Sequence, residues 1–148
     1  MRIAGSHAAW VQLDVLDWEF PDGDDSWLVV AGGAALGGHR NRRWSFTDAC
    51  LEMPEARELA AWLRAAGHGR VEVDAPATEA SLTFLEPVLG FALAARRDTM
   101  LLIRAFFAAE GVPAWARRRR PAGEVVDLWV RPDALLMPPT TGMPNSTT

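Results

Sequence analysis

The amino-acid sequence predicts a single α+β domain in which one amphipathic helix packs on a mainly antiparallel β-sheet. Three observations predict this class. The chain has 148 residues, of which 49% are hydrophobic and 23% charged, and this is the size and composition of one globular domain. Most of its apolar residues alternate with polar ones, as they do in strands with one buried face. A single segment repeats its apolar residues with the spacing of a helix.

The first strands are predicted between residues 10 and 46. Residues 10–18 alternate imperfectly between apolar and polar side chains, which favours a strand with one buried face. Residues 21–26 are rich in Pro, Asp, Gly and Ser, the residues that form turns. Apolar runs follow at 27–31 and 44–46. The glycine pairs at 32–33 and 37–38 indicate that these two runs form a hairpin with an unusually long loop.

The helix is predicted from Pro54 to Ala66. Proline suits the first helical turn, where its missing N–H group costs nothing. Glu55 and Glu58 complement the positive end of the helix dipole. An apolar stripe then faces the core, and Gly67 is placed to end the helix. The stripe consists of Leu59, Trp62, Leu63 and Ala66.

The remaining strands are predicted after this helix. Alternation returns at 81–84, at 89–93 and at 126–130, and residues 100–106 form a longer, mostly buried run. The polar residues 96–98 indicate a hairpin turn between two of these strands. We expect one core to join helix and sheet, formed by Trp44, Phe46, Leu59, Trp62, Leu63, Phe84, Leu89 and Phe91. Residues 138–148 are rich in Pro and Thr and are predicted to be a disordered tail.

Charge is distributed unevenly along the chain. The net charge is −4, but the first thirty residues alone carry one Arg against six acids. An acidic chain of this kind is a poor general binder of nucleic acid, which requires neutralised phosphates. No targeting segment or membrane span is visible, so the sequence predicts a cytoplasmic protein without membrane association.

Motifs for catalysis are missing from the sequence. The chain contains no Lys and therefore no phosphate-binding G-x-x-x-x-G-K-[ST] loop. Its three histidines lie far apart, and its single cysteine, Cys50, has no positioned base and is expected to be a small buried hydrophobe. The acidic run at 22–25 lacks the glycine and glutamate spacing of a calcium loop. We therefore predict no enzyme activity, no cofactor and no metal site.

Several segments together resemble the WapI family of bacterial immunity proteins. They occur in the family's order within residues 13–131, although Ala49 stands where the family commonly has proline and the C-terminus lacks a further helix. The segments are LDWEFPD (16–22), DSWLVV (25–30), WSFTDACL (44–51), ELAAWL (58–63) and LTFLEPVL (82–89). The resemblance implies that residues 1–137 are an immunity-type α+β domain.

The resemblance also implies a function. Immunity proteins of this family are cytoplasmic antidotes that bind the toxic C-terminal domain of a large polymorphic toxin, which is often a nuclease. A basic nuclease surface would meet an acidic patch with fast, salt-sensitive association. Asp24 and Asp25 are the strongest candidates for contact with the toxin. The full set of partner-binding candidates is Asp17, Glu19, Asp22, Asp24, Asp25 and Trp27.

Two other functions remain open at the level of the sequence. The sheet could carry a small-molecule or regulatory site in a concavity lined by some of the seven tryptophans. An RNA-binding role would use Arg40, Arg42, Arg43 and the arginine run at 117–120, although the negative net charge argues against it. The sequence does not determine the oligomeric state.

Overall fold

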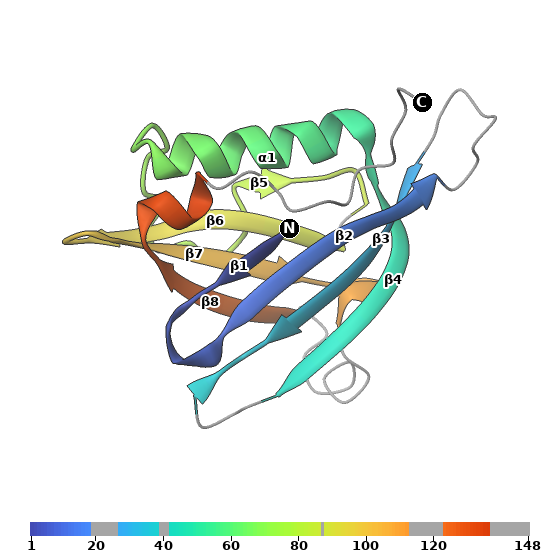
Figure 1. The fold of residues 1–148 in the computed structure, drawn as a ribbon, viewed down its shortest axis with the longest axis horizontal. Helices are drawn as coiled ribbons and strands as arrows, with labels where there is room; N and C mark the ends of the chain where they lie inside the picture. The colour runs from blue at the N-terminus through green and yellow to red at the C-terminus, as the bar shows by residue number, and fades with distance from the viewer. Residues whose placement is uncertain (19–26, 39–41, 87, 113–122, 137–148) are drawn as a thin grey trace.

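A computed structural model describes residues 1–18, 27–38, 42–86, 88–112 and 123–136. Within these residues, eight strands form two antiparallel sheets of four, with one α-helix between them in the chain (Figure 1). The first sheet has the order β1 (Arg2–Ala4), β2 (Trp10–Trp18), β3 (Trp27–Ala35) and β4 (Arg43–Glu52). The second has the order β5 (Leu82–Thr83), β6 (Leu89–Arg97), β7 (Met100–Phe107) and β8 (Glu124–Val130). The predicted α+β class is therefore confirmed.

The division into two sheets follows from the place of the helix in the chain. Within each sheet every strand pairs with its neighbours in sequence, so each is a simple meander. The helix α1 (Met53–Gly67) separates β4 from β5, and it lies across the top of the two sheets in Figure 1. Short 3₁₀ turns complete the fold: η1 (Ser6–Ala8), η3 (Ala109–Gly111) and η4 (Pro132–Leu135). In the described residues, α1 is too short to span a membrane, and no other helix could do so.

The helix agrees with its prediction except at its end. It begins with a capping box, in which Glu55 accepts a hydrogen bond from the backbone N–H of Glu52 (3.0 Å). Gly67 is the last helical residue rather than the residue after it. A Cβ atom at Gly67 would lie 2.8 Å from the carbonyl oxygen of Pro132, so glycine is needed there for close packing of η4. The left-handed conformation is taken by Gly69 instead (φ 75°).

The strand β3 runs through the glycine pair that was expected to begin a loop. Gly32 pairs with Phe46 and Gly33 with Ser45, so both glycines belong to the sheet. A Cβ atom at Gly32 would collide with the aromatic ring of Phe46. The missing side chain therefore makes room for a core aromatic residue, and the connection to β4 is only residues 36–42.

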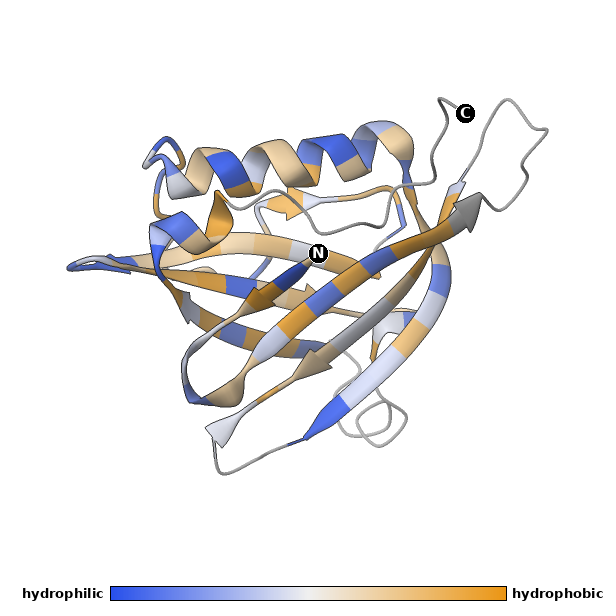
Figure 2. Cartoon of the chain, viewed as in Figure 1, coloured by the Kyte–Doolittle hydropathy of each residue, from blue (hydrophilic) through white to orange (hydrophobic). Residues whose placement is uncertain are grey.

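A single hydrophobic core joins both sheets and the helix. Figure 2 shows apolar residues distributed along the strands of both sheets and along the helix. Seven of the eight predicted core residues are buried, and Trp62 is half-buried against the ring of Phe91 (centroids 6.3 Å apart). Trp44 packs edge-on against Phe107 (5.5 Å) and donates its indole N–H to the carbonyl of Gly111 (2.8 Å). This bond ties η3 to β4.

An arginine holds the segment between α1 and β5 against the second sheet. Arg104 of β7 forms a bidentate ion pair with Asp127 of β8, with distances of 2.7 and 3.1 Å. Its remaining terminal nitrogen donates to the carbonyl oxygens of Pro76 and Ala77 (3.3 and 3.0 Å). Residues 71–80 are thereby fixed without secondary structure of their own. The predicted tail at 138–148 lies outside the described residues.

Candidate partner-binding surface

Two of the six predicted partner-binding residues, Asp17 and Trp27, lie where β2 ends and β3 begins. Asp17 occupies the last part of β2, where it pairs with Val29, and Trp27 is the first residue of β3. Because β2 and β3 are antiparallel neighbours, the acidic segment between them leaves and re-enters the first sheet at the same end. Glu19, Asp22, Asp24 and Asp25 themselves lie outside the described residues.

Further acids surround this end of the sheet. Trp27 pairs with Glu52, which is both the last residue of β4 and the N-cap of α1. Glu55 follows in the first turn of the helix, and its second carboxylate oxygen accepts a hydrogen bond from the backbone N–H of Leu85 (2.8 Å). Together with three neighbouring acids they form a group that we call the acidic end: Asp48, Glu52, Glu55, Glu86 and Glu110.

Electrostatic effects show that several of these acids are close together. Burial raises the pKa of Asp48, and the nearby carboxylate of Glu110 raises it further. Burial also raises the pKa of the Cys50 thiol to about 12, with smaller contributions from the charges of Asp48, Glu55 and Glu86. No ion pair involves the five acids within the described parts of the chain. The acidic end therefore carries uncompensated negative charge.

An exposed apolar side chain accompanies these charges. Leu85 is 72% exposed, although its backbone is fixed by the hydrogen bond to Glu55. A large apolar side chain held rigidly in water and bordered by charge is typical of an interface contact. Leu16, near the end of β2, is also exposed (58%). The surface thus offers apolar contact as well as charge.

The opposite end of β4 has the opposite charge. Arg43 begins the strand and is exposed, as is Arg42 just before it. The strand has 10 residues, so Arg43 at its start is about 30 Å from Glu52 at its end. Arg40 and the arginine run at 117–120 lie outside the described residues. Of the arginines named for the alternative RNA-binding role, the structure therefore describes only Arg42 and Arg43.

Catalytic groups do not converge in the described part of the molecule. His7 and His68 are exposed, and no group of three or more His, Cys, Asp or Glu residues there could hold a metal ion. Cys50 is fully buried, and its raised pKa keeps the thiol protonated at neutral pH. The expectation that Cys50 is a small buried hydrophobe is confirmed.

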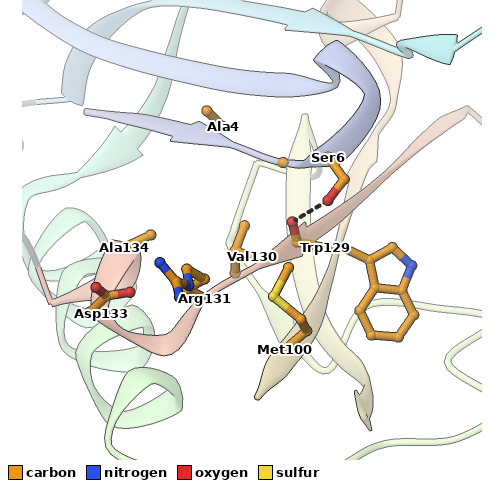
Figure 3. Close-up of a pocket in the computed structure, with 9 residues that line it drawn as sticks. Ala4, Ser6, Met100, Trp129, Val130, Arg131, Asp133 and Ala134 are labelled. Carbon is orange, nitrogen blue, oxygen red and sulfur yellow. Dashed lines mark hydrogen bonds between the residues drawn. The ribbon is translucent and has the colours of Figure 1, made fainter. Parts of the chain in front are cut away.

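An open depression of about 350 Å³ lies between β1, the end of β8 and η4 (Figure 3). Ser6 donates a hydrogen bond across it to the carbonyl oxygen of Trp129 (3.5 Å), and Arg131 and Asp133 lie on its other side. Trp129 is the one tryptophan among its lining residues, and Arg97 stacks on that indole ring (5.6 Å). This depression is not the tryptophan-lined concavity that a small-molecule site of the expected kind requires.

Sequence reasoning named the hairpin acids as partner-binding candidates but not the five acids of the acidic end. Glu52 and Glu55 have a visible signal, because they form the capping box that starts the helix. Glu86 and Glu110 have none. They reach the same region only because the β5–β6 connection and η3 pack beside β4 and α1, which depends on tertiary contacts.

Comparison with known proteins supplies a family. The model of the immunity protein WapI-like family matches residues 2–135, which covers both sheets, the helix and η4. No curated protein and no solved structure matches the chain significantly.

Proposed function

Since the chain belongs to the immunity protein WapI-like family, we propose that it binds a cognate toxin of a polymorphic toxin system and neutralises it without turnover. The observation that carries this proposal is the family match over residues 2–135, which includes every described strand and helix. Such a protein would act in the cytoplasm of the producing cell.

The partner we propose is a basic C-terminal toxin domain, with a nuclease as the specific candidate. A nuclease must attract phosphates, so its active surface is cationic. The acidic end and the hairpin segment beside it offer the complementary charge. Contacts are assigned to the hairpin residues Asp17, Glu19, Asp22, Asp24, Asp25 and Trp27. Bound there, the protein would cover the toxin's cationic surface and exclude its substrate.

A charge reversal in the hairpin segment tests this proposal. The probe is the purified C-terminal domain of the large toxin whose gene we expect directly upstream. Asp24→Arg with Asp25→Arg should slow association at least tenfold at low salt and weaken its salt dependence, because steering charges act on the rate of encounter. Stopped-flow association at several salt concentrations measures both effects.

A matched control separates local contact from overall charge. Glu72→Arg with Glu79→Arg changes the net charge equally, and both positions are exposed in the segment held by Arg104. This control should associate nearly as fast as wild type and protect toxin-expressing cells. Equal slowing by both double variants would mean that only overall charge matters. Failure of the wild-type protein to bind the toxin domain would refute the immunity function.

A further inference from the structure

The hydrogen-bond pattern of the first sheet determines which backbone groups of β4 face outward. The N–H of Leu36 donates to the carbonyl of Arg42 (2.9 Å), and the antiparallel register continues from there without interruption to Val29↔Ala49. Hydrogen-bonded and non-hydrogen-bonded pairs alternate in such a ladder. The backbone groups of Trp44, Phe46 and Asp48 therefore face β3. Those of Arg43, Ser45, Thr47 and Ala49 face away from the sheet.

Over this stretch, the outer edge of β4 is unpaired in the part of the chain that the structure describes. β4 is the last strand of the first sheet, and in the described residues no strand pairs with its outer side. The side chains of Ser45 and Thr47 are exposed, and residues 43–49 contain neither a proline nor a bulge. Sheet edges are ordinarily protected by such features or by a covering segment. A regular edge of this length, with which no strand of the described residues pairs, is a template for another strand.

The other sheet edges are less suitable. β5 has only two residues. The outward groups of β8 face β1 and η1: Ser6 bonds the carbonyl of Trp129, and a Cβ atom at Gly5 would lie 3.0 Å from the Cα atom of Leu128. The outer side of β1 faces β8 in turn. β4 is accordingly the one long edge that the described elements leave accessible (Figure 1).

Charge at this edge favours a cationic occupant. Asp48 lies on β4 beside Glu110 of η3, and neither has an ion-pair partner in the described residues. A second copy of the chain would bring another such acid pair and a further net charge of −4. A strand carrying Lys or Arg opposite Asp48 would instead compensate both carboxylates.

We propose that a cationic extended segment of the toxin adds to β4 as a fifth strand of the first sheet, hydrogen-bonded to Ser45, Thr47 and Ala49, with a basic side chain between Asp48 and Glu110. Strand addition of this kind takes affinity from backbone hydrogen bonds and specificity from side chains. This inference rests on the proposed function, because it adds the edge of β4 to the hairpin residues as a second contact with the same toxin.

Hydrogen exchange on the wild-type protein tests the proposal without any substitution. In the free protein the amides of Ser45, Thr47 and Ala49 should exchange quickly, while those of Trp44, Phe46 and Asp48 are protected by β3. Binding of the purified toxin domain should slow the first three at least tenfold. A stable complex in which these three amides keep their free exchange rates would overturn the strand proposal and leave the immunity function intact.

Proline substitution provides an independent test by affinity. Thr47→Pro removes an outward N–H group and should weaken toxin binding at least tenfold, since the incoming strand loses that hydrogen bond and meets the proline ring. Thr47→Ala keeps the N–H group and should bind like wild type. Val125→Pro removes an outward N–H group from β8 and is the matched control, with unchanged affinity expected. Equal weakening by the two proline variants would contradict the assignment to β4.

The identity of the occupant is tested by charge and concentration. Asp48→Asn with Glu110→Gln should reduce affinity at least fivefold and reduce its salt dependence, whereas unchanged affinity would refute the cationic contact. Protection of Ser45, Thr47 and Ala49 that grows with protein concentration in the absence of toxin would show that a second copy occupies the edge. If the wild-type protein does not bind the toxin at all, the proposed function fails together with this inference.

Discussion

Two adjacent glycines in β3 lie against aromatic rings that differ in exposure. A Cβ atom at Gly32 would collide with the buried ring of Phe46, whereas one at Gly33 would lie 3.1 Å from the half-exposed ring of Trp10. We expect Gly32→Ala to lower the free energy of unfolding by about 1–3 kcal/mol, as overpacking a core does. Gly33→Ala should be nearly neutral, because Trp10 can shift and the unfolded chain loses entropy worth about 0.4–1 kcal/mol. Equal losses in urea denaturation would contradict this reading.

Cys50 makes stability depend on pH in the alkaline range. Burial raises its pKa to about 12 in the folded state, while in the unfolded chain a thiol has a pKa of about 8.5. The folded state therefore holds the proton more tightly. The resulting stabilisation is complete below about pH 8 and is lost as the pH rises toward 12.

The composition of the chain makes this effect measurable. It contains no Lys and no Tyr, so no other side chain ordinarily titrates between pH 8 and 11. We expect the free energy of unfolding of the wild-type protein to fall by up to about 1.4 kcal/mol per pH unit in this interval. Cys50→Ala should show an almost flat profile. If both profiles fall in parallel, Cys50 is not the titrating group.

At the level of elements, the start of α1 joins three parts of the fold. The carboxylate of Glu55 accepts hydrogen bonds from the backbone of Glu52 at the end of β4 and of Leu85 after β5. We expect Glu55→Ala to destabilise the protein by about 1–2 kcal/mol, because both N–H groups lose their acceptor. Glu58→Ala is the control, since Glu58 is exposed on the same helix, and its thermal denaturation should match wild type within about 0.5 kcal/mol.

The elements that sequence predicted well are those with a repeated pattern. β2 and α1 have enough residues for a period to be recognised, and their observed limits differ from the predicted ones by at most one residue. β1 was missed because its three residues place a single side chain, that of Ile3, in the core. β3 was predicted too short because glycine is ordinarily a sign of a loop, whereas here Gly32 makes room for Phe46.

For the whole molecule, one continuous core predicts one unfolding transition. Leu59 and Leu63 of the helix, Val30 of the first sheet and Phe91 of the second belong to the same buried cluster. We expect circular dichroism and tryptophan fluorescence to give coincident thermal transitions, as they do for a two-state domain. An earlier transition by one probe would mean that a sheet or the helix unfolds separately.

The candidate surface was predictable only where it is local in sequence. The hairpin acids lie within nine positions of one another, from Asp17 to Asp25, so their clustering can be read directly. Glu86 and Glu110 come from distant segments, and the open edge of β4 depends on which strand ends the sheet. Neither property is encoded in a local pattern. The first arises from the packing of η3 and the β5–β6 connection beside α1 and β4, and the second from the strand order of the first sheet.

The opposite charges at the two ends of β4 make the edge of the sheet electrically polar. Arg43 and Glu52 are about 30 Å apart, a separation that creates an electric dipole along the sheet edge. A charged molecule approaching this dipole experiences a torque and turns before contact. An added strand with its cations at one end could then pair in one polarity only, because the reverse polarity would set those cations against Arg43. The edge would thus distinguish two segments of identical composition and opposite order.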